Sequence, residues 1–387
     1  MNFEFATATR IIFGAGRLQE IGDLTRGFGK HALVVTGRQP RHAEPLLAWL
    51  ARSPANPAVT RFSIAGEPTL SDVRKGVEIA RAAGGDFVIA LGGGSAIDAG
   101  KAIAAMLTND GELLDYLEVI GAGRALTRTG APFIAIPTTA GTGAEVTRNA
   151  VLTSPEHRCK VSLRSPLLLP KVALIDPELT YGLPPAITAR TGLDALTQLI
   201  EPYTCCRPNP MVDALCAEGI RRAARSLRAA WVEGSNRAAR EDMCVASLFG
   251  GLALANAGLG AVHGLAAPIG GRFAAPHGAV CAALLPAVMT ANLRALRSRA
   301  PDSGVLRRYD AVAQWLTGEA TATADAGVAW VSELVSELRI PKLRDYGMGE
   351  PHIAELAAKA TRASSMKANP LVLTGEELAA ILRQAMG

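Results

Sequence analysis

The first half of the chain contains four short apolar runs separated by stretches of helical length. The runs cover residues 31–36, 87–91, 133–136 and 172–175, and each ends at a glycine, a proline or an Asp-Pro pair. A parallel sheet is covered by helices on both faces, so its strands read as continuous apolar runs rather than as alternating ones. The pattern therefore predicts an α/β domain built on a buried parallel sheet.

The sequence changes in character near residue 183, where Pro184 and Pro185 interrupt the chain. Beyond them it is rich in Ala, Leu, Arg and Glu at helical spacing, and stretches such as 211–231 and 240–257 have helix length without β-branched runs. A length of 387 residues suits two domains. We predict an α/β domain over residues 1–182 and an all-α helical domain over 183–387.

Composition and charge exclude several classes of protein. The 40 basic and 35 acidic residues give a net charge of +5 without a basic cluster, so we expect no nucleic-acid partner. No apolar run of about 18 residues occurs, so we expect no membrane span, and residues 1–14 do not resemble a signal peptide. The six cysteines show no zinc-type CxxC pair, which favours reduced thiols and a cytoplasmic location.

A glycine-rich turn, Gly92-Gly93-Gly94-Ser95, lies where the second apolar run passes into a predicted helix. Glycine lets a ligand approach the backbone closely, and the first amides of a helix carry positive partial charge. Gly93, Gly94 and Ser95 are therefore candidates for binding a phosphate or pyrophosphate. The spacing differs from GxGxxG, and a purely structural turn is the alternative.

A threonine-rich loop at residues 137–147 follows the third apolar run. Its hydroxyl groups suit a phosphate, a ribose or a nicotinamide amide, and they belong to Thr138, Thr139, Thr142 and Thr147. The alternative is a solvated loop in which threonines cap helices. Two such turns after central strands favour a ligand crevice at the carboxyl edge of the sheet.

Four segments taken together resemble the iron-containing (group III) alcohol dehydrogenase family. They are GGGSAIDAGKAIA (92–104), PTTAGTGAEVT (137–147), TGLDALTQLIEPY (191–203) and VHGLAAPIGGRFAAPHG (262–278), in that order. The resemblance implies a dehydroquinate-synthase-like fold, with a dinucleotide-binding α/β domain and a helical domain enclosing NAD(P) and a divalent metal in the cleft between them. It also suggests a homodimer.

The same resemblance implies that Fe²⁺ or Zn²⁺ is bound by Asp194, Gln198, His263 and His277, with His263 and His277 at the catalytic centre. Asp194 and Gln198 are four residues apart and share a helix face. A carboxylate and imidazoles from separate helices can enclose such a metal and leave one position open. The alternative for each histidine is a packing or capping role.

Local sequence places the two histidines at helix ends. We expect His263 near the end of a helical stretch that Pro268 and the Gly270-Gly271 pair break, and His277, after Pro276, at the start of the next helix.

Two positions depart from the family pattern. Gln198 stands where the family usually has a metal-binding histidine, and an amide oxygen is a weaker ligand for Fe²⁺ or Zn²⁺ than imidazole. Ala267 stands where the family commonly has a histidine near the substrate. The loss of that imidazole leaves the proton relay open between a ribose hydroxyl, water and His263. It also makes the pocket less polar, which favours a bulkier or more apolar substrate.

Cofactor choice depends on the turn after the first apolar run. NAD-selective members of the family tend to have an acidic residue where this chain has Gly37, followed by Arg38 and Arg41. Guanidinium groups without a carboxylate would accommodate a 2′-phosphate, so we expect NADP rather than NAD. Solvated arginines in a surface turn are the alternative.

Two further residues complete the sequence-based site. The resemblance places Asp98 and Lys160 beside the cofactor, whereas Lys160 as a surface residue of a β-ribbon is the alternative. For Asp98 with Lys101, three residues later, the alternative is an ordinary surface ion pair.

The sequence thus predicts an NAD(P)-dependent enzyme that interconverts an alcohol and an aldehyde or ketone. The metal would polarise the substrate oxygen. One alternative is a maleylacetate-reductase-like enzyme that works without metal and binds an acidic substrate through Arg272. Another is a nucleotide-binding protein that has lost catalysis.

Overall fold

The computed structural model describes residues 2–38, 41–157 and 159–387, which form two compact units. The first, here the α/β unit, comprises Ala6–Thr139 and Gly143–Tyr181. The second, here the helical unit, comprises Gly182–Gly387 with the short segments before Ala6 and at Ala140–Thr142. The predicted fold class, an α/β domain followed by an all-α domain, is confirmed.

A six-stranded parallel sheet is the centre of the α/β unit. Its strand order is β1-β8-β5-β4-β2-β3, with bounds β1 Arg10–Phe13, β2 His31–Gly37, β3 Ala58–Ile64, β4 Phe87–Gly92, β5 Phe133–Pro137 and β8 Val172–Ile175. The four predicted strands are the four inner ones. The edge strand β3 was missed because it is only partly buried and lacks a continuous apolar run, whereas the edge strand β1 lies within the strand-like start of the chain.

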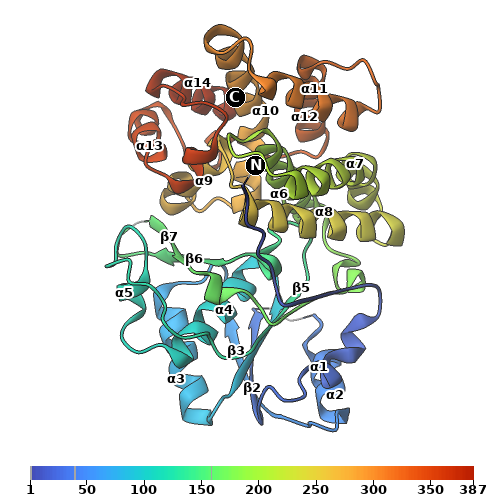
Figure 1. Cartoon of the computed structure of the whole chain (residues 1–387), viewed down its shortest axis with the longest axis vertical. Coiled ribbons are helices and arrows are strands. Elements are labelled where there is room, and N and C mark those ends of the chain that lie inside the picture. Colours follow the sequence, from blue (N-terminus) through green and yellow to red (C-terminus); the bar gives the residue numbers. More distant parts are fainter. Residues whose placement is uncertain (1, 39–40, 158) are drawn as a thin grey trace. The chain divides into compact units, whose positions relative to one another are not determined.

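Helices cover both faces of this sheet (Figure 1). One apolar core lies under α1 (Ile21–Leu24) and α2 (Ala43–Arg52), and the other under α3 (Leu70–Ala83), α4 (Gly94–Thr108) and α5 (Leu113–Tyr116). The chain moves outward from β2 to β3 and then returns past β2 to β4. The strand order therefore reverses between β2 and β4, and in open α/β sheets ligands bind at the carboxyl ends of strands at such a point.

A two-stranded antiparallel ribbon, β6 (Asn149–Ser154) with β7 (Cys159–Arg164), follows the threonine-rich loop. Its first strand packs on α4. The ribbon thus connects the threonine-rich loop to the helix that follows β4.

The helical unit consists of longer helices. Its elements are α6 Pro185–Thr204, α7 Pro210–Val232, α8 Arg237–Asn256, α9 Ala261–Arg272, α10 His277–Arg299, α11 Gly304–Thr317, α12 Ala324–Glu337, α13 Ile353–Ala360 and α14 Gly375–Met386. Helix α6 is buried along most of its length and packs against α7, α8 and α10.

One prediction about this unit is wrong. Pro268 and the Gly270-Gly271 pair do not break the helix after His263, because α9 begins at Ala261 and continues to Arg272. A proline inside a helix costs about 3 kcal/mol. Each fully buried apolar side chain contributes about 1.5–3 kcal/mol, and α9 buries Val262, Leu265 and Ile269. Burial therefore offsets the proline, and His263 lies in the first turn of the helix.

Helix α10 has the length and the mean hydropathy, 1.6, of a membrane span, but 72% of that apolar window is buried inside the protein. Helices α8 and α9 reach the length and hydropathy of a membrane span only when they are taken together, and they are bent by 95° relative to each other. A buried core helix accounts for both observations.

Candidate active site

Three turns meet at the carboxyl edge of the α/β unit's sheet. The last residues of β4 and β5, Gly92 and Pro137, pair with each other, and β2 ends level with them at Gly37. A Cβ atom on Gly93 would lie 3.3 Å from Oγ1 of Thr139, so the glycine-rich turn and the threonine-rich loop touch. The residues that the sequence singled out after three separate strands are thus neighbours.

Helix α4 presents its N-terminus at this edge. Gly93 is its N-cap residue and has no side chain with which to cap the first amides. Gly94 and Ser95, the first two residues of the helix, are only partly buried. Uncapped amides at a helix N-terminus attract an anion such as a phosphate.

A buried lysine holds the threonine-rich loop in place. The ammonium group of Lys101 donates to the carbonyl oxygens of Ala144, Thr147 and Asn149 at 2.8–2.9 Å and to Oγ1 of Thr147 at 3.0 Å. Lys101 is 1% exposed and its Nζ lies 3.9 Å from Asp98. The alternative of a surface ion pair between Asp98 and Lys101 is therefore wrong.

Burial disfavours the charged forms of two side chains in this region, one basic and one acidic. It lowers the pKa of Lys101 to about 8 and raises the pKa of Glu145, in the same loop, to about 7. The hydroxyl of Thr147 accepts from Lys101 and donates to Ala144, so it serves the shape of the loop. Thr138, Thr139 and Thr142 are partly exposed.

Among the other predicted cofactor residues, Asp98 and Lys160 make contacts within the protein, whereas the two arginines are exposed. Asp98 accepts a hydrogen bond from the amide of Val151 at 3.2 Å. Lys160, on β7, pairs with Glu67 at 2.7 Å and its side chain is only 6% exposed. Arg38 and Arg41 are exposed on either side of residues 39–40, which lie outside the described residues.

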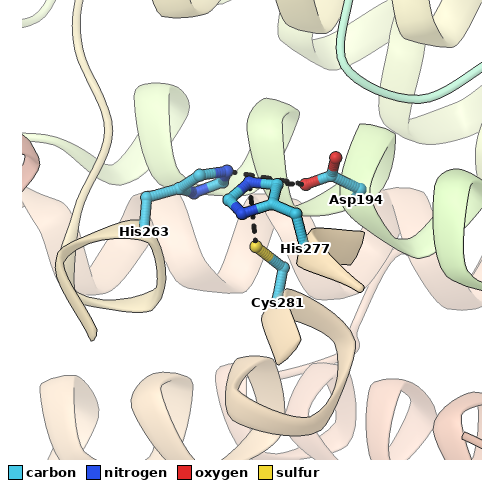
Figure 2. Close-up of side chains that lie close together, drawn as sticks. All are labelled: Asp194, His263, His277 and Cys281. Atoms are coloured by element: carbon cyan, nitrogen blue, oxygen red, sulfur yellow. Dashed lines mark hydrogen bonds and ion pairs between the residues drawn. The ribbon is translucent and has the colours of Figure 1, made fainter. Parts of the chain in front are cut away.

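The helical unit gathers a second group of polar side chains. Asp194 comes from α6, His263 from α9, and His277 and Cys281 from α10, and one ligand atom of each lies within 4.8 Å of all the others. Nε2 of His263 is 3.5 Å and Nε2 of His277 is 3.9 Å from Oδ1 of Asp194. Figure 2 shows the four side chains converging, with His277 beside Cys281.

Gln198 belongs to the same face of α6 as Asp194, one turn later. Its amide nitrogen donates to the carbonyl of Gly141 at 3.2 Å, which leaves Oε1 as the group without a partner. Oδ1 of Asp194 is likewise buried and without a hydrogen-bond donor. Both residues are 2% exposed. Buried oxygens without donors are costly unless a cation completes them, so these residues fit a divalent metal.

Glu201 orients the buried histidine. Its Oε2 lies 2.6 Å from Nδ1 of His263, and its Oε1 accepts from the amide of Val262 at 2.7 Å. With Nδ1–H committed to the carboxylate, Nε2 of His263 is the nitrogen left for a metal. A Cβ on Gly260 would lie 2.9 Å from Oε1 of Glu201, so glycine is required at this helix start.

A second glycine positions His277. A Cβ on Gly278 would lie 2.4 Å from the carbonyl oxygen of Arg190 and 3.3 Å from Cβ of Asp194. The absence of that atom lets the start of α10 approach α6 closely. His277 is thereby brought beside Asp194.

The charges in this group influence one another. Burial alone raises the pKa of Asp194, but the imidazoles of His277 and His263 outweigh it and lower that pKa. Burial likewise raises the pKa of the Cys281 thiol, and the same two imidazoles lower it overall. The site thus favours the deprotonated forms of its acidic groups.

Two other positions named from the sequence lie on α9. Ala267 follows His263 by one helical turn and is partly buried. The guanidinium of Arg272 pairs with Glu355. Arg272 is therefore engaged by a carboxylate of the chain itself.

Sequence reasoning missed Glu201 and Cys281. Helical spacing offers a signal for both, because Glu201 is seven residues after Asp194 and Cys281 is four after His277, but spacing alone does not show which face of α10 meets α6. Neither residue was assigned a role because neither belongs to the ligand set that the resemblance implies.

Comparisons with known proteins agree with this architecture. The profile described as "Iron-containing alcohol dehydrogenase" matches residues 8–177, and "Fe-containing alcohol dehydrogenase family, C-terminal" matches residues 188–386. The chain is 36% identical over 394 residues to 1,3-propanediol dehydrogenase of Klebsiella pneumoniae, covering 99% of this chain and 98% of that protein. It is 35% identical over 398 residues to Long-chain-alcohol dehydrogenase 1 of Geobacillus thermodenitrificans, covering 98% and 97%. A crystal structure of 1,3-propanediol oxidoreductase superposes with a TM-score of 0.92 at 35% identity over 100% of both chains.

A parallel-sheet unit with a phosphate-type turn and a helical unit with a metal-type cluster define a class, the nicotinamide-dependent oxidoreductases that use a metal. The chain belongs to the iron-containing alcohol dehydrogenase family. It is an oxidoreductase that interconverts an alcohol and an aldehyde or ketone. The predicted family and activity are confirmed.

Proposed function

We propose that this enzyme reduces aldehydes, or oxidises the corresponding alcohols, with a divalent metal held by Asp194, Gln198, His263 and His277. The observation that carries the proposal is the convergence of Asp194, His263 and His277, together with a buried oxygen on Asp194 and another on Gln198 that make no hydrogen bond. When bound, the metal supplies a Lewis acid that polarises the substrate oxygen. Catalytic roles are proposed for His263 and His277, which would hold the metal with their imidazoles.

The chain's own residues do the rest of the work. Glu201 holds Nδ1–H of His263, so the imidazole keeps one tautomer and one orientation through the reaction. Burial of Asp194 and His263 excludes water, which strengthens charge interactions in the site. Hydride transfer itself is the chemistry of the nicotinamide.

The cofactor is proposed to bind at the carboxyl edge of the sheet in the α/β unit. Gly93, Gly94 and Ser95 would receive the pyrophosphate at the N-terminus of α4. The remaining cofactor contacts are proposed for Asp98, Thr138, Thr139, Thr142 and Lys160, with Thr147 acting through the shape of the loop. The reversal of strand order between β2 and β4 supports this location.

The cofactor is proposed to be NADP. Gly37 ends β2 and offers no carboxylate to a ribose 2′-hydroxyl, whereas Arg38 and Arg41 are exposed next to it. Guanidinium groups bind phosphate through paired charge-assisted hydrogen bonds. A cytoplasmic location, a homodimer and the domain roles assigned to residues 1–182 and 183–387 belong to the same proposal.

The substrate is proposed to be a medium or long aliphatic aldehyde or alcohol rather than a short, strongly polar one. Ala267 shares the face of α9 that carries His263, and its methyl group adds an apolar surface there. One relative with 35% identity is named as a long-chain-alcohol dehydrogenase. Activity confined to short polar alcohols would contradict the substrate class.

The test is elemental analysis of the purified protein combined with NADPH and NADH oxidation on a panel of aldehydes. We expect about one divalent ion per chain, loss of turnover after chelation and recovery on adding metal back. Asp194→Ala should retain the fold but neither metal nor turnover. Full activity of metal-free protein on an acidic enoate would favour the maleylacetate-reductase-like alternative, and NADPH binding without any turnover would favour loss of catalysis.

A further inference from the structure

We infer that Cys281 is itself a metal ligand, and that this thiolate makes the site in the helical unit selective for Zn²⁺ over Fe²⁺. The inference rests on the proposed function, because it concerns the same metal site, and it adds a donor that the four proposed ligands do not include. The resulting centre would have Asp194, His263, His277 and Cys281 as its strong donors, with Gln198 as a weak donor whose position a substrate could take.

The first argument is distance. In a tetrahedral centre, metal–nitrogen bonds of about 2.0–2.1 Å and a metal–sulfur bond of about 2.3 Å separate the two donor atoms by about 3.5 Å. Sγ of Cys281 lies 3.6 Å from Nε2 of His277. The same geometry separates a nitrogen and an oxygen by about 3.4 Å, and the two imidazoles lie 3.5 and 3.9 Å from Oδ1 of Asp194. Three of the six pairs of donor atoms thus have nearly the spacing that one ion requires, and all six pairs lie within 4.8 Å.

The second argument concerns hydrogen bonding. A simple hydrogen bond between the Cys281 thiol and His277 would account for that one contact. It would leave the buried Oε1 of Gln198 without a partner, and Oδ1 of Asp194 with only its longer contacts to the two imidazoles at 3.5 and 3.9 Å. A single cation held by Asp194 and the sulfur would supply a close partner for Oδ1, and Gln198, one turn later on the same face of α6, would offer it Oε1. A bound metal therefore accounts for the sulfur and the two buried oxygens together, whereas the thiol–imidazole hydrogen bond accounts for one contact.

The third argument is the position of Cys281 in the chain. It follows His277 by four residues on α10, so both side chains point from the same face of one helix. Cys281 is completely buried, and Cys244 on α8 is 4% exposed. Only the first of these two buried thiols has a carboxylate and two imidazoles around it.

The chemistry of the donor atoms determines which metal ion the site prefers. A thiolate is a soft donor that favours Zn²⁺, whereas an amide oxygen is a weak donor for this ion. Cys281 would supply the strong fourth bond, and Gln198 would remain the weakest donor and the one displaced most easily. On binding, the S–H bond breaks as the sulfur–metal bond forms, and the proton leaves to solvent.

The test is cobalt substitution in the full-length protein. After removal of resident metal, addition of Co²⁺ should give a thiolate-to-cobalt charge-transfer band in the near ultraviolet. Cys281→Ser should bind cobalt without the band, and its affinity for Zn²⁺ should fall at least about tenfold, as expected for loss of a ligand. The band should persist in Gln198→Ala and in the matched control Cys244→Ser.

A competition experiment tests the selectivity. With equal Zn²⁺ and Fe²⁺ under anaerobic conditions, wild-type protein should retain zinc, and Cys281→Ser should lose at least tenfold of that preference. A wild-type cobalt spectrum without the band, or failure to bind cobalt at all, overturns the inference. The wild-type spectrum decides the point even if Cys281→Ser does not fold.

The two proposals fail separately. Metal-dependent turnover without a thiolate band would leave the proposed function standing and remove Cys281 from the ligand set. A thiolate band in a protein that turns over no aldehyde would retain the zinc site and contradict the dehydrogenase proposal.

Discussion

The two units each bury a charged centre, but the two centres differ in how completely their hydrogen bonds are made. In the α/β unit, Lys101 donates to three carbonyl oxygens and one hydroxyl, all within 3.0 Å. In the helical unit, Asp194 and Gln198 each keep one buried oxygen without a donor. The first centre is complete as a folded chain, whereas the second would be completed by the proposed ion.

This difference separates structural from functional polar groups. A buried group whose partners all belong to the chain stabilises the fold. A buried group whose partner is missing indicates a ligand that the protein is built to receive. The following predictions test whether the two centres behave in these two ways.

The largest expected effect is on the complete centre. Lys101→Met should lower the free energy of unfolding by about 3–5 kcal/mol, because it leaves buried carbonyl groups without their donor. Chemical denaturation of the metal-free protein measures the change. Gln198→Leu in the same metal-free protein is the matched control and should cost about 1 kcal/mol, since it loses only the one hydrogen bond to the carbonyl of Gly141 and its Oε1 has no donor to lose. Equal losses in both variants would remove the distinction.

The second effect is a pH dependence at Glu145. Burial raises the pKa of this carboxyl from 4.5 to about 7, so the folded chain holds a proton that the unfolded chain has released. The contribution to stability is fully present below pH 4.5 and is lost as pH rises through about 7. The difference between these two pKa values corresponds to about 3 kcal/mol in the free energy of unfolding.

The variant Glu145→Gln keeps a neutral, hydrogen-bonding side chain and should remove this pH dependence. Thermal or denaturant unfolding of both proteins across the interval measures it. If the wild-type and variant curves run parallel between pH 4.5 and about 7, the carboxyl is not protonated in the folded protein.

A third effect concerns the incomplete centre. Glu201→Gln should weaken metal binding about 10–100-fold, because the amide orients His263 less firmly than the carboxylate. Competition with a chromophoric chelator gives the affinity. Glu241→Gln, at an exposed position on α8, is the control and should leave it unchanged. An unchanged affinity in Glu201→Gln would mean that His263 needs no carboxylate partner.

The smallest effect is at the solvent-exposed edge of the sheet. Arg38→Asp should reduce the preference for NADPH over NADH by about tenfold, since a charge-assisted hydrogen bond is worth about 1.5–3 kcal/mol and exposure weakens it. The ratio of kcat/KM values for the two cofactors is the measurement. The variant Arg26→Asp, at an exposed arginine elsewhere in the α/β unit, should leave the ratio as it is.

Much of the fold was predictable from local pattern. The inner strands β2, β4, β5 and β8 are buried on both faces, and their continuous apolar runs signal this directly. The edge strand β3 was not predictable by the same rule, because its exposed residues interrupt the run. Helix α9 was misjudged because tertiary burial, which a local pattern does not contain, outweighs the cost of Pro268.

The residues of the candidate site likewise fall into those that the sequence predicted and those that it could not predict. Asp194, His263 and His277 were named through motifs, and the structure brings them together. The surroundings of Lys101 were not predictable, because its three carbonyl partners lie 43–48 residues further along the chain. Cys281 required knowledge of which face of α10 meets α6, and Gly278 determines that contact.

The order of the ligands along the chain has a consequence for biosynthesis. The last strand of the sheet ends at Ile175, whereas the first proposed ligand is Asp194 and the last is Cys281. Every strand therefore leaves the ribosome before any ligand does, and domains generally fold in that order during synthesis. Cells grown with too little metal should then accumulate chains that are folded in the sheet and still empty among α6, α9 and α10. Such chains can be matured later by the ion alone, without new protein synthesis.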